Sequence, residues 1–162
     1  MTQHLELIDE FLNAHGFTRS KKKYFIRNTS AEISIGYQVF VDKRPMGHVL
    51  VQFGFCCFCK RIMLKLKQLE PRQYAMLASS DPIFLISIDD VAEQLKIKKS
   101  RALNWYSSLE LPIETWLKEF EPVFQQINEY FELHTGSDAA LGALLSSGDL
   151  FIRESEDIKR VI

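Results

Sequence analysis

The chain has 162 residues, of which 46% are hydrophobic, and its formal net charge is −1. This length and apolar content suit one domain with a sizeable core, which argues against a disordered chain and against two domains. No apolar run reaches the roughly 18 residues that a membrane-spanning helix needs, and the first ten residues do not have the pattern of a secretion signal. We therefore expect a single cytoplasmic domain over residues 1–162, with no membrane partner.

The first predicted element is an amphipathic helix from His4 to His15. Its apolar residues recur at helical spacing, and Gly16 follows where a helix-ending glycine is common. A lysine-rich link over residues 19–23 then leads to a short strand from Tyr24 to Asn28.

Residues 31–59 predict the β-hairpin around which the other elements are organised. Apolar and polar residues alternate from Ile33 to Val41 and again from Val49 to Cys59, as in two half-buried strands. If the numbers of paired residues sum to 90, Ile35 lies opposite Phe55 and one face of the ribbon is wholly apolar. Short connections join this hairpin to the strand before it, so we expect an antiparallel meander.

The opposite face of this hairpin carries two glycines and two glutamines. In the same register Gly36 faces Gly54 and Gln38 faces Gln52, which makes a shallow notch. Glycine inside a strand often marks a bulge or a close approach by another backbone. Two interpretations stay open: a helix of the fold crosses the notch, or a ligand or peptide binds in it.

Shorter elements follow the hairpin. Residues 61–67 alternate like a strand, and Asp90 with Glu93 has the spacing of a capping box at the start of a helix. In chain order we expect a strand at 61–67, a short helix at 72–78, a strand at 83–88, and helices at 90–96 and 102–111.

The last third of the chain predicts two amphipathic helices. Apolar residues recur three or four positions apart from Ile113 to His134, and Pro122 predicts a kink or a break near residues 118–120. Ser137 can cap a last helix that runs to about Ser147. Residues 150–162 show no clean period and predict a loosely packed tail with a possible short helix. The whole pattern indicates an α+β fold, with an antiparallel sheet packed against N-terminal and C-terminal helices.

Residue patterns that would indicate an enzyme are missing from the chain. It has no glycine-rich phosphate loop, no His-Glu-x-x-His and no Gly-x-Ser-x-Gly. The three cysteines, Cys56, Cys57 and Cys59, form one cluster, whereas zinc sites usually draw on two separated ligand pairs. We therefore expect reduced and buried thiols, no metal, no cofactor and no enzymatic activity.

Charge is unevenly distributed along the chain. Residues 1–105 carry 16 Lys and Arg against 10 Asp and Glu, whereas residues 106–162 carry 4 against 11. Two alternatives stay open: the two halves neutralise each other inside the fold, or the acidic half faces a basic protein partner. In the second case Glu121, Glu129 and Glu132 would lie in the interface.

Four basic clusters raise single-stranded nucleic-acid binding as a further alternative. An RNP-type pattern is missing, and the aromatic residues of the hairpin fall mainly on the face predicted to be buried, so this alternative is disfavoured. The clusters lie at residues 19–23, 60–61, 65–67 and 96–101.

Short motifs follow one another in a distinct order over about residues 5–58. After the first helix come His15-Gly16-Phe17, Tyr24-Phe25-Ile26-Arg27, and a hairpin with Gln38 in one strand and Gln52-Phe53-Gly54 in the next. This order resembles an uncharacterised bacterial family of small α+β domains. The resemblance implies a non-enzymatic protein-binding domain, because some members look like immunity proteins that neutralise polymorphic toxins. Small-molecule binding at the Gly36/Gly54 notch stays an alternative.

Overall fold

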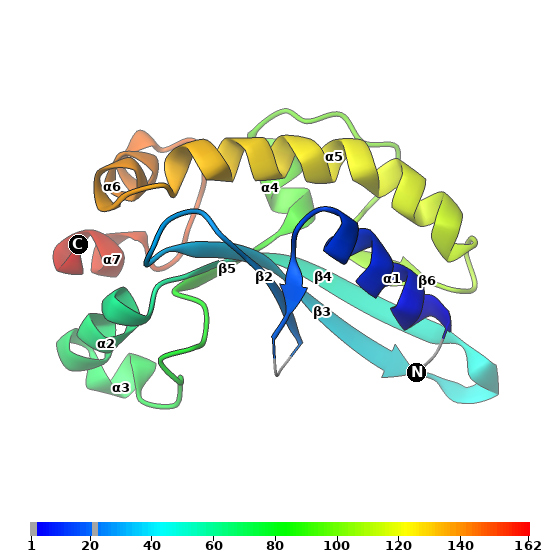
Figure 1. The fold of residues 1–162 in the computed structure, drawn as a ribbon, viewed down its shortest axis with the longest axis horizontal. Helices are drawn as coiled ribbons and strands as arrows, with labels where there is room; N and C mark the ends of the chain where they lie inside the picture. The colour runs from blue at the N-terminus through cyan, green and yellow to red at the C-terminus, as the bar shows by residue number, and fades with distance from the viewer. Residues whose placement is uncertain (1–2, 21–22) are drawn as a thin grey trace.

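The structure is a computed structural model that describes residues 3–20 and 23–162. This part of the chain forms a six-stranded antiparallel sheet with helices on both faces (Figure 1), so the predicted α+β class is confirmed. The strands are β1 (Thr18–Arg19), β2 (Tyr24–Asn28), β3 (Ser34–Lys43), β4 (Val49–Phe58), β5 (Phe84–Ser87) and β6 (Trp105–Ser107). The helices are α1 (Gln3–Ala14), α2 (Lys60–Leu69), α3 (Pro71–Tyr74), α4 (Ile88–Gln94), α5 (Ile113–His134), α6 (Asp138–Ser147) and α7 (Ser155–Val161), with a 3-10 turn at Pro45–Gly47.

Strands β3 and β4 form the long hairpin, but the predicted register is wrong by two residues. The numbers of paired residues sum to 92, so Ile35 lies opposite Cys57. A shift of two residues keeps every side chain on its face, and alternation alone cannot distinguish the two registers. The conformation of the loop fixes the register. Met46 and Gly47 both have positive φ, 66° and 75°, and this centres the turn on Met46.

The sheet order is β1-β2-β3-β4-β5, and β6 also pairs with β4. Strand β5 pairs with residues 54–57 of β4 and β6 with residues 50–52, so the two short strands cover successive parts of one edge. The helix predicted at 102–111 is therefore wrong. Edge pairing with a strand about 50 residues earlier in the chain overrides the local apolar spacing.

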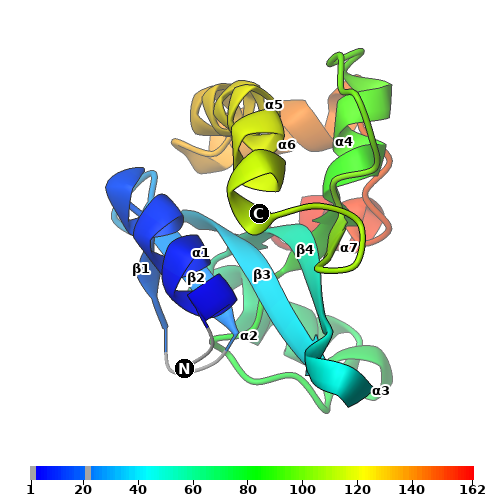
Figure 2. The same cartoon turned by 90° about the vertical axis from the view of Figure 1, so that its right-hand side faces the viewer.

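Helix α5 lies across one face of the sheet, which we call the inner face, with α4 and α6 beside it (Figures 1 and 2). Phe53 stacks on Trp116 with ring centroids 4.6 Å apart, and Phe55 stacks on Phe131 at 3.8 Å. Tyr37 is fully buried between the sheet and this helix, where its hydroxyl donates to Asn128 Oδ1 at 2.8 Å. The predicted stripe of α5 is thus the centre of the core.

Helix α5 runs unbroken from Ile113 to His134 although Pro122 lies inside it. In Figure 1 its first turns slope toward β6 and the rest runs along the sheet, so the predicted kink is present and the predicted break is not. Proline removes one backbone donor and crowds the preceding turn, which bends a helix that tertiary packing holds together.

Helix α2 replaces the strand predicted at 61–67. Ile62, Met63 and Leu66 are buried while Leu64 is exposed, which is the spacing of a helix face and not the alternation of a strand. Helix α4 also begins earlier than predicted, and its N-cap is Ser87, so Asp90 does not start a capping box.

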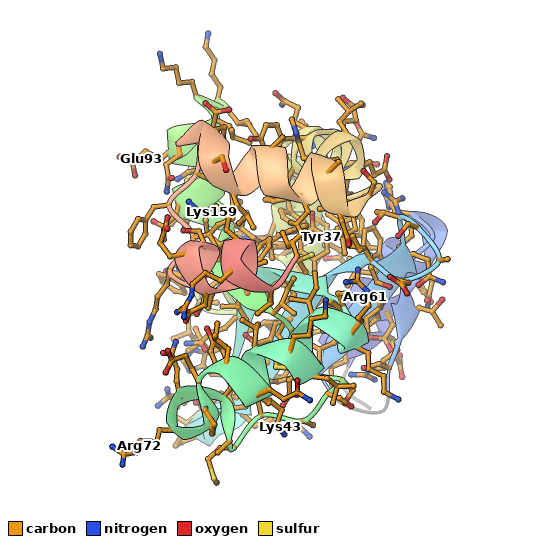
Figure 3. All side chains as sticks on the ribbon, turned by 90° about the vertical axis from the view of Figure 1, so that its left-hand side faces the viewer. Tyr37, Lys43, Arg61, Arg72, Glu93 and Lys159 are labelled. Atoms are coloured by element: carbon orange, nitrogen blue, oxygen red, sulfur yellow. The ribbon has the colours of Figure 1, made fainter. Side chains whose placement is uncertain are left out.

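The C-terminal segment contains the possible short helix, α7, but it is packed against the fold and is not the loose tail predicted. Leu150, Ile152 and Ile158 are buried, and Figure 3 shows α7 between α6 and α2. The predicted cap of α6 is confirmed, because the Ser137 hydroxyl accepts a hydrogen bond from the Ala140 N–H at 3.1 Å. Within the described residues, no helix has the length and apolar content needed to cross a bilayer.

Candidate functional site

The face of the sheet opposite α5, which we call the outer face, is covered at one end only. Figure 1 shows α2 and α3 beneath that end, while the hairpin extends beyond them. At the covered end, Tyr24, Cys56 and Phe58 form a second, smaller apolar cluster. At the hairpin end the outer face is open, and Phe40 and Trp105 are 48% and 38% exposed.

The predicted notch does not form. In the observed register Gly36 lies opposite Cys56, and Gly54 lies opposite Gln38. A Cβ on Gly36 would lie 2.2 Å from the Phe25 carbonyl oxygen, and one on Gly54 would lie 3.5 Å from the Leu85 side chain. Both glycines are therefore covered by neighbouring strands and side chains, and neither a ligand nor a crossing helix is needed to explain them.

The two predicted glutamines do share the outer face. Gln38 is half-buried, and Gln52 is exposed between Phe40 of β3 and Trp105 of β6, with which it is in register. Adjacent strands are about 4.8 Å apart, so the two rings flank the Gln52 amide with their Cα atoms roughly 10 Å apart. This row of three residues, which we call the aromatic row, carries no charged side chain.

Lys23 is a cation that lies beside the aromatic row. Its Nζ lies 5.8 Å from the centroid of the Phe40 ring and 5.9 Å from that of Tyr24, within the range of cation–π attraction. Met46 at the tip of the hairpin is also fully exposed, and the ion pair of Asp42 with Arg44 lies between it and Phe40 in the chain. Exposed aromatic side chains gathered on one face commonly mark an interaction site.

Two of the three carboxylates predicted to face a partner contact a histidine or an arginine of the same chain. Glu121 lies 3.2 Å from the Nε2 of His15, and Glu132 accepts a hydrogen bond from Arg27. Glu129 is exposed on the same helix. These pairs join the C-terminal half of the chain to the N-terminal half, as the internal-neutralisation alternative predicts.

Several members of the basic clusters are likewise engaged within the fold. Arg61 donates to Glu32 and to both oxygens of Asp138, and Figure 3 shows it between α2 and the α6 end of the molecule. Lys67 and Lys65 donate to backbone carbonyls, Lys99 pairs with Asp89, and Arg101 pairs with Glu119. Lys21 and Lys22 lie outside the described residues.

All three cysteines are buried and unpaired by disulfides. Cys56 belongs to the outer cluster, Cys57 to the inner core, and Cys59 precedes α2 as its N-cap residue. Burial raises the pKa of the Cys56 and Cys57 thiols far above the usual range, and the neighbouring sulfurs add to the effect at Cys57. Among the described residues no group of three His, Cys, Asp or Glu side chains is placed to hold a metal ion.

The thiols of Cys56 and Cys57 should not react with Ellman's reagent at pH 8 in the folded protein. Only the thiolate reacts, and a raised pKa keeps these groups protonated at pH 8 and above. After unfolding in guanidinium chloride, all three cysteines should react, as measured by the absorbance of the coloured thiolate that the reagent releases. Rapid reaction of either thiol in the native protein would contradict the burial described above.

Sequence reasoning missed Trp105, because the segment around it was predicted to be helical. It also missed Tyr74 and Glu154, which lie beside the outer face and are described below. No family model, no curated protein and no solved structure matches this chain significantly. The geometry of the outer face is thus the basis for a functional proposal.

Proposed function

We propose that the protein is a non-enzymatic protein-binding domain whose contact surface is the hairpin end of the outer face. The observation that carries the proposal is the aromatic row: two large rings, Phe40 and Trp105, are exposed on either side of Gln52. The buried centres of protein interfaces are enriched in aromatic residues and depleted of charge, and Trp is frequent among the residues that dominate binding energy.

The arrangement of charge favours a protein over a single-stranded nucleic acid. Aromatic platforms that bind a single strand are combined with a positively charged track for its phosphates. Here Arg61, Lys67, Lys99 and Arg101 are used in contacts within the fold, and Lys23 is the described cation that lies over the rings of the outer face.

A toxin is the partner class that the sequence resemblance favours. Immunity proteins act by binding, so such a role needs no catalytic group on this surface. A toxin gene immediately beside the gene for this chain would support the assignment, and the purified pair should then form a complex through the aromatic row. A solitary gene would count against a toxin and leave the protein-binding proposal itself in place.

Site-specific photo-crosslinking in the producing organism tests the surface. A photoreactive amino acid at position 52 should give one crosslinked protein, identified by mass spectrometry, whereas the same group at Gln125, exposed on α5, should not. Phe40→Asp and Trp105→Asp should each reduce the crosslink about tenfold, because they put a charge at the centre of the contact.

Thermal unfolding is the control for these variants, since both positions are partly exposed and the fold should persist. Equal crosslinking from positions 52 and 125 would contradict the proposal. So would a crosslink from position 52 to nucleic acid, or one that both aspartate variants leave unchanged.

A further inference from the structure

A groove of about 500 Å³ opens beside the covered end of the outer face. Its lining comes from β2, α3, the approach to β5 and the residue before α7. The walls include the rings of Tyr24 and Tyr74 and the side chain of Leu85, and the charged groups include Lys23, Asp81 and Glu154. The groove therefore combines aromatic and aliphatic surface with two carboxylates and one ammonium.

Glu154 is the charged group in this groove that the fold does not use. Its side chain makes no capping hydrogen bond to α7, and no ion pair joins it to a lysine or arginine in the described ranges 3–20 and 23–162. Burial raises the pKa of this carboxyl, although its own backbone N–H and the charge of Arg153 oppose the effect. Burial outweighs both of these contacts, so the charge of this half-buried carboxylate costs stability and the fold gains nothing from it.

The neighbouring carboxylates of α7 differ from Glu154 because they have partners. Asp157 accepts a hydrogen bond from the Tyr74 hydroxyl at 2.9 Å, and Glu156 pairs with Lys159 at 2.5 Å on the exposed side of the helix. Lys23 lines the groove, but its Nζ lies over the rings of Tyr24 and Phe40. A carboxylate beside aromatic rings is a combination that binds guanidinium and ammonium groups, through a charge-assisted hydrogen bond and cation–π attraction.

We propose that the groove receives an arginine or lysine side chain of the partner protein, with its cationic group at Glu154 and its methylene stem against Leu85. This inference rests on the proposed protein-binding function. Leu85 pairs with Cys56, which lies four residues along β4 from Gln52. At about 3.3 Å per residue this distance is roughly 13 Å. An extended segment with a basic residue about four positions from an apolar one therefore reaches both the groove and the aromatic row.

The test is a titration of the full-length, ¹⁵N-labelled protein with Nα-acetyl-arginine N-methylamide at constant ionic strength. Amide shifts should be confined to the groove, around Tyr74, Leu85 and Glu154, with a Kd on the order of millimolar for a single side chain. The neutral analogue Nα-acetyl-citrulline N-methylamide should bind at least about fivefold more weakly, because it lacks the charge-assisted contact.

Glu154→Gln should abolish the preference for the arginine probe, and Glu156→Gln should leave it unchanged. Glu156 is the matched control because it lies on the same helix with its side chain 81% exposed. The raised pKa of Glu154 means that the folded state favours the protonated carboxyl, so its charge at pH 7 opposes folding. The Glu154→Gln variant should therefore unfold at the same or a higher temperature.

Equal shifts from the arginine and citrulline probes would overturn the inference. Binding of Nα-acetyl-aspartate N-methylamide in place of the arginine probe would do so as well, because Lys23 or Arg153 would then define the ligand. The crosslink from position 52 tests the proposed function separately. If that crosslink persists while no arginine binds, only the assignment of the groove fails. If arginine binds while the crosslink is absent, the groove binds a cationic side chain but the aromatic row is not the contact surface.

Discussion

Replacing Phe53 by alanine should lower the free energy of unfolding by about 3–5 kcal/mol. Phe53 is buried on the inner face, stacked on Trp116 at 4.6 Å and in contact with Phe120 at 5.8 Å between ring centroids. Alanine removes the ring from both contacts and leaves a cavity between β4 and α5 that the helix cannot close without shifting. Guanidinium chloride denaturation followed by circular dichroism measures the loss.

Phe40→Ala is the matched control for this prediction. Phe40 lies on β3, the strand paired with β4, but its side chain is on the outer face. Its loss should cost less than about 1 kcal/mol, because the ring is half-exposed before truncation. A loss of similar size at both positions would mean that the inner and outer faces are not distinguished as described, and it would also remove Phe40 as a clean probe of partner binding.

Elements that bury one face against a single neighbouring layer were predictable from the sequence, because their apolar residues recur with the period of a strand or a helix. The alternation over residues 31–59 identifies the hairpin because one face packs on α5 and the other does not. The stripe and the bounds of α5 follow from the same principle. Helix α6 was predictable for a local reason, since the Ser137 cap and the left-handed Gly148 act within one turn of its ends.

Elements that depend on distant contacts were not predictable. Strand β6 forms because the edge of β4 beyond β5 is otherwise unpaired. The sequence around Trp105 does not indicate that such an edge is present. Helix α2 was mistaken for a strand because Ile62, Leu64 and Leu66 alternate, and only the burial of Met63 in place of Leu64 reveals the helix. The hairpin register depended on the left-handed conformation of Met46, which its side chain does not favour.

The candidate site shows the same division. Gln38 and Gln52 were placed on one face correctly, because the period of a strand fixes the face in either register. The sequence did not predict that Trp105 lies beside Gln52 on that face, since the two residues are about 50 positions apart in the chain. The sequence did not identify Glu154 as a site residue, because the residues around it come from distant segments: α3, β2 and the approach to β5.

Replacing Gly36 by alanine should lower the free energy of unfolding by at least about 3 kcal/mol, at the upper end of what overpacking costs. The added Cβ would lie 2.2 Å from the backbone oxygen of Phe25 and 3.1 Å from the ring of Phe58. The oxygen belongs to β2, which pairs with β3 at this position, so it cannot retreat without separating the two strands. Denaturant midpoints and the yield of folded protein measure the effect.

Gly54→Ala separates this steric effect from the general effect of replacing a strand glycine. Its Cβ would make ordinary contacts, 3.5 Å from the Leu85 side chain, and alanine also restricts the unfolded chain. The variant should therefore stay within about 1 kcal/mol of the parent protein. If both glycine variants unfold at the same denaturant concentration as the parent, β2 and β3 must be farther apart at Gly36 than the structure places them. The covered end of the outer face, which depends on that spacing through Tyr24 and Phe58, would then need a different arrangement.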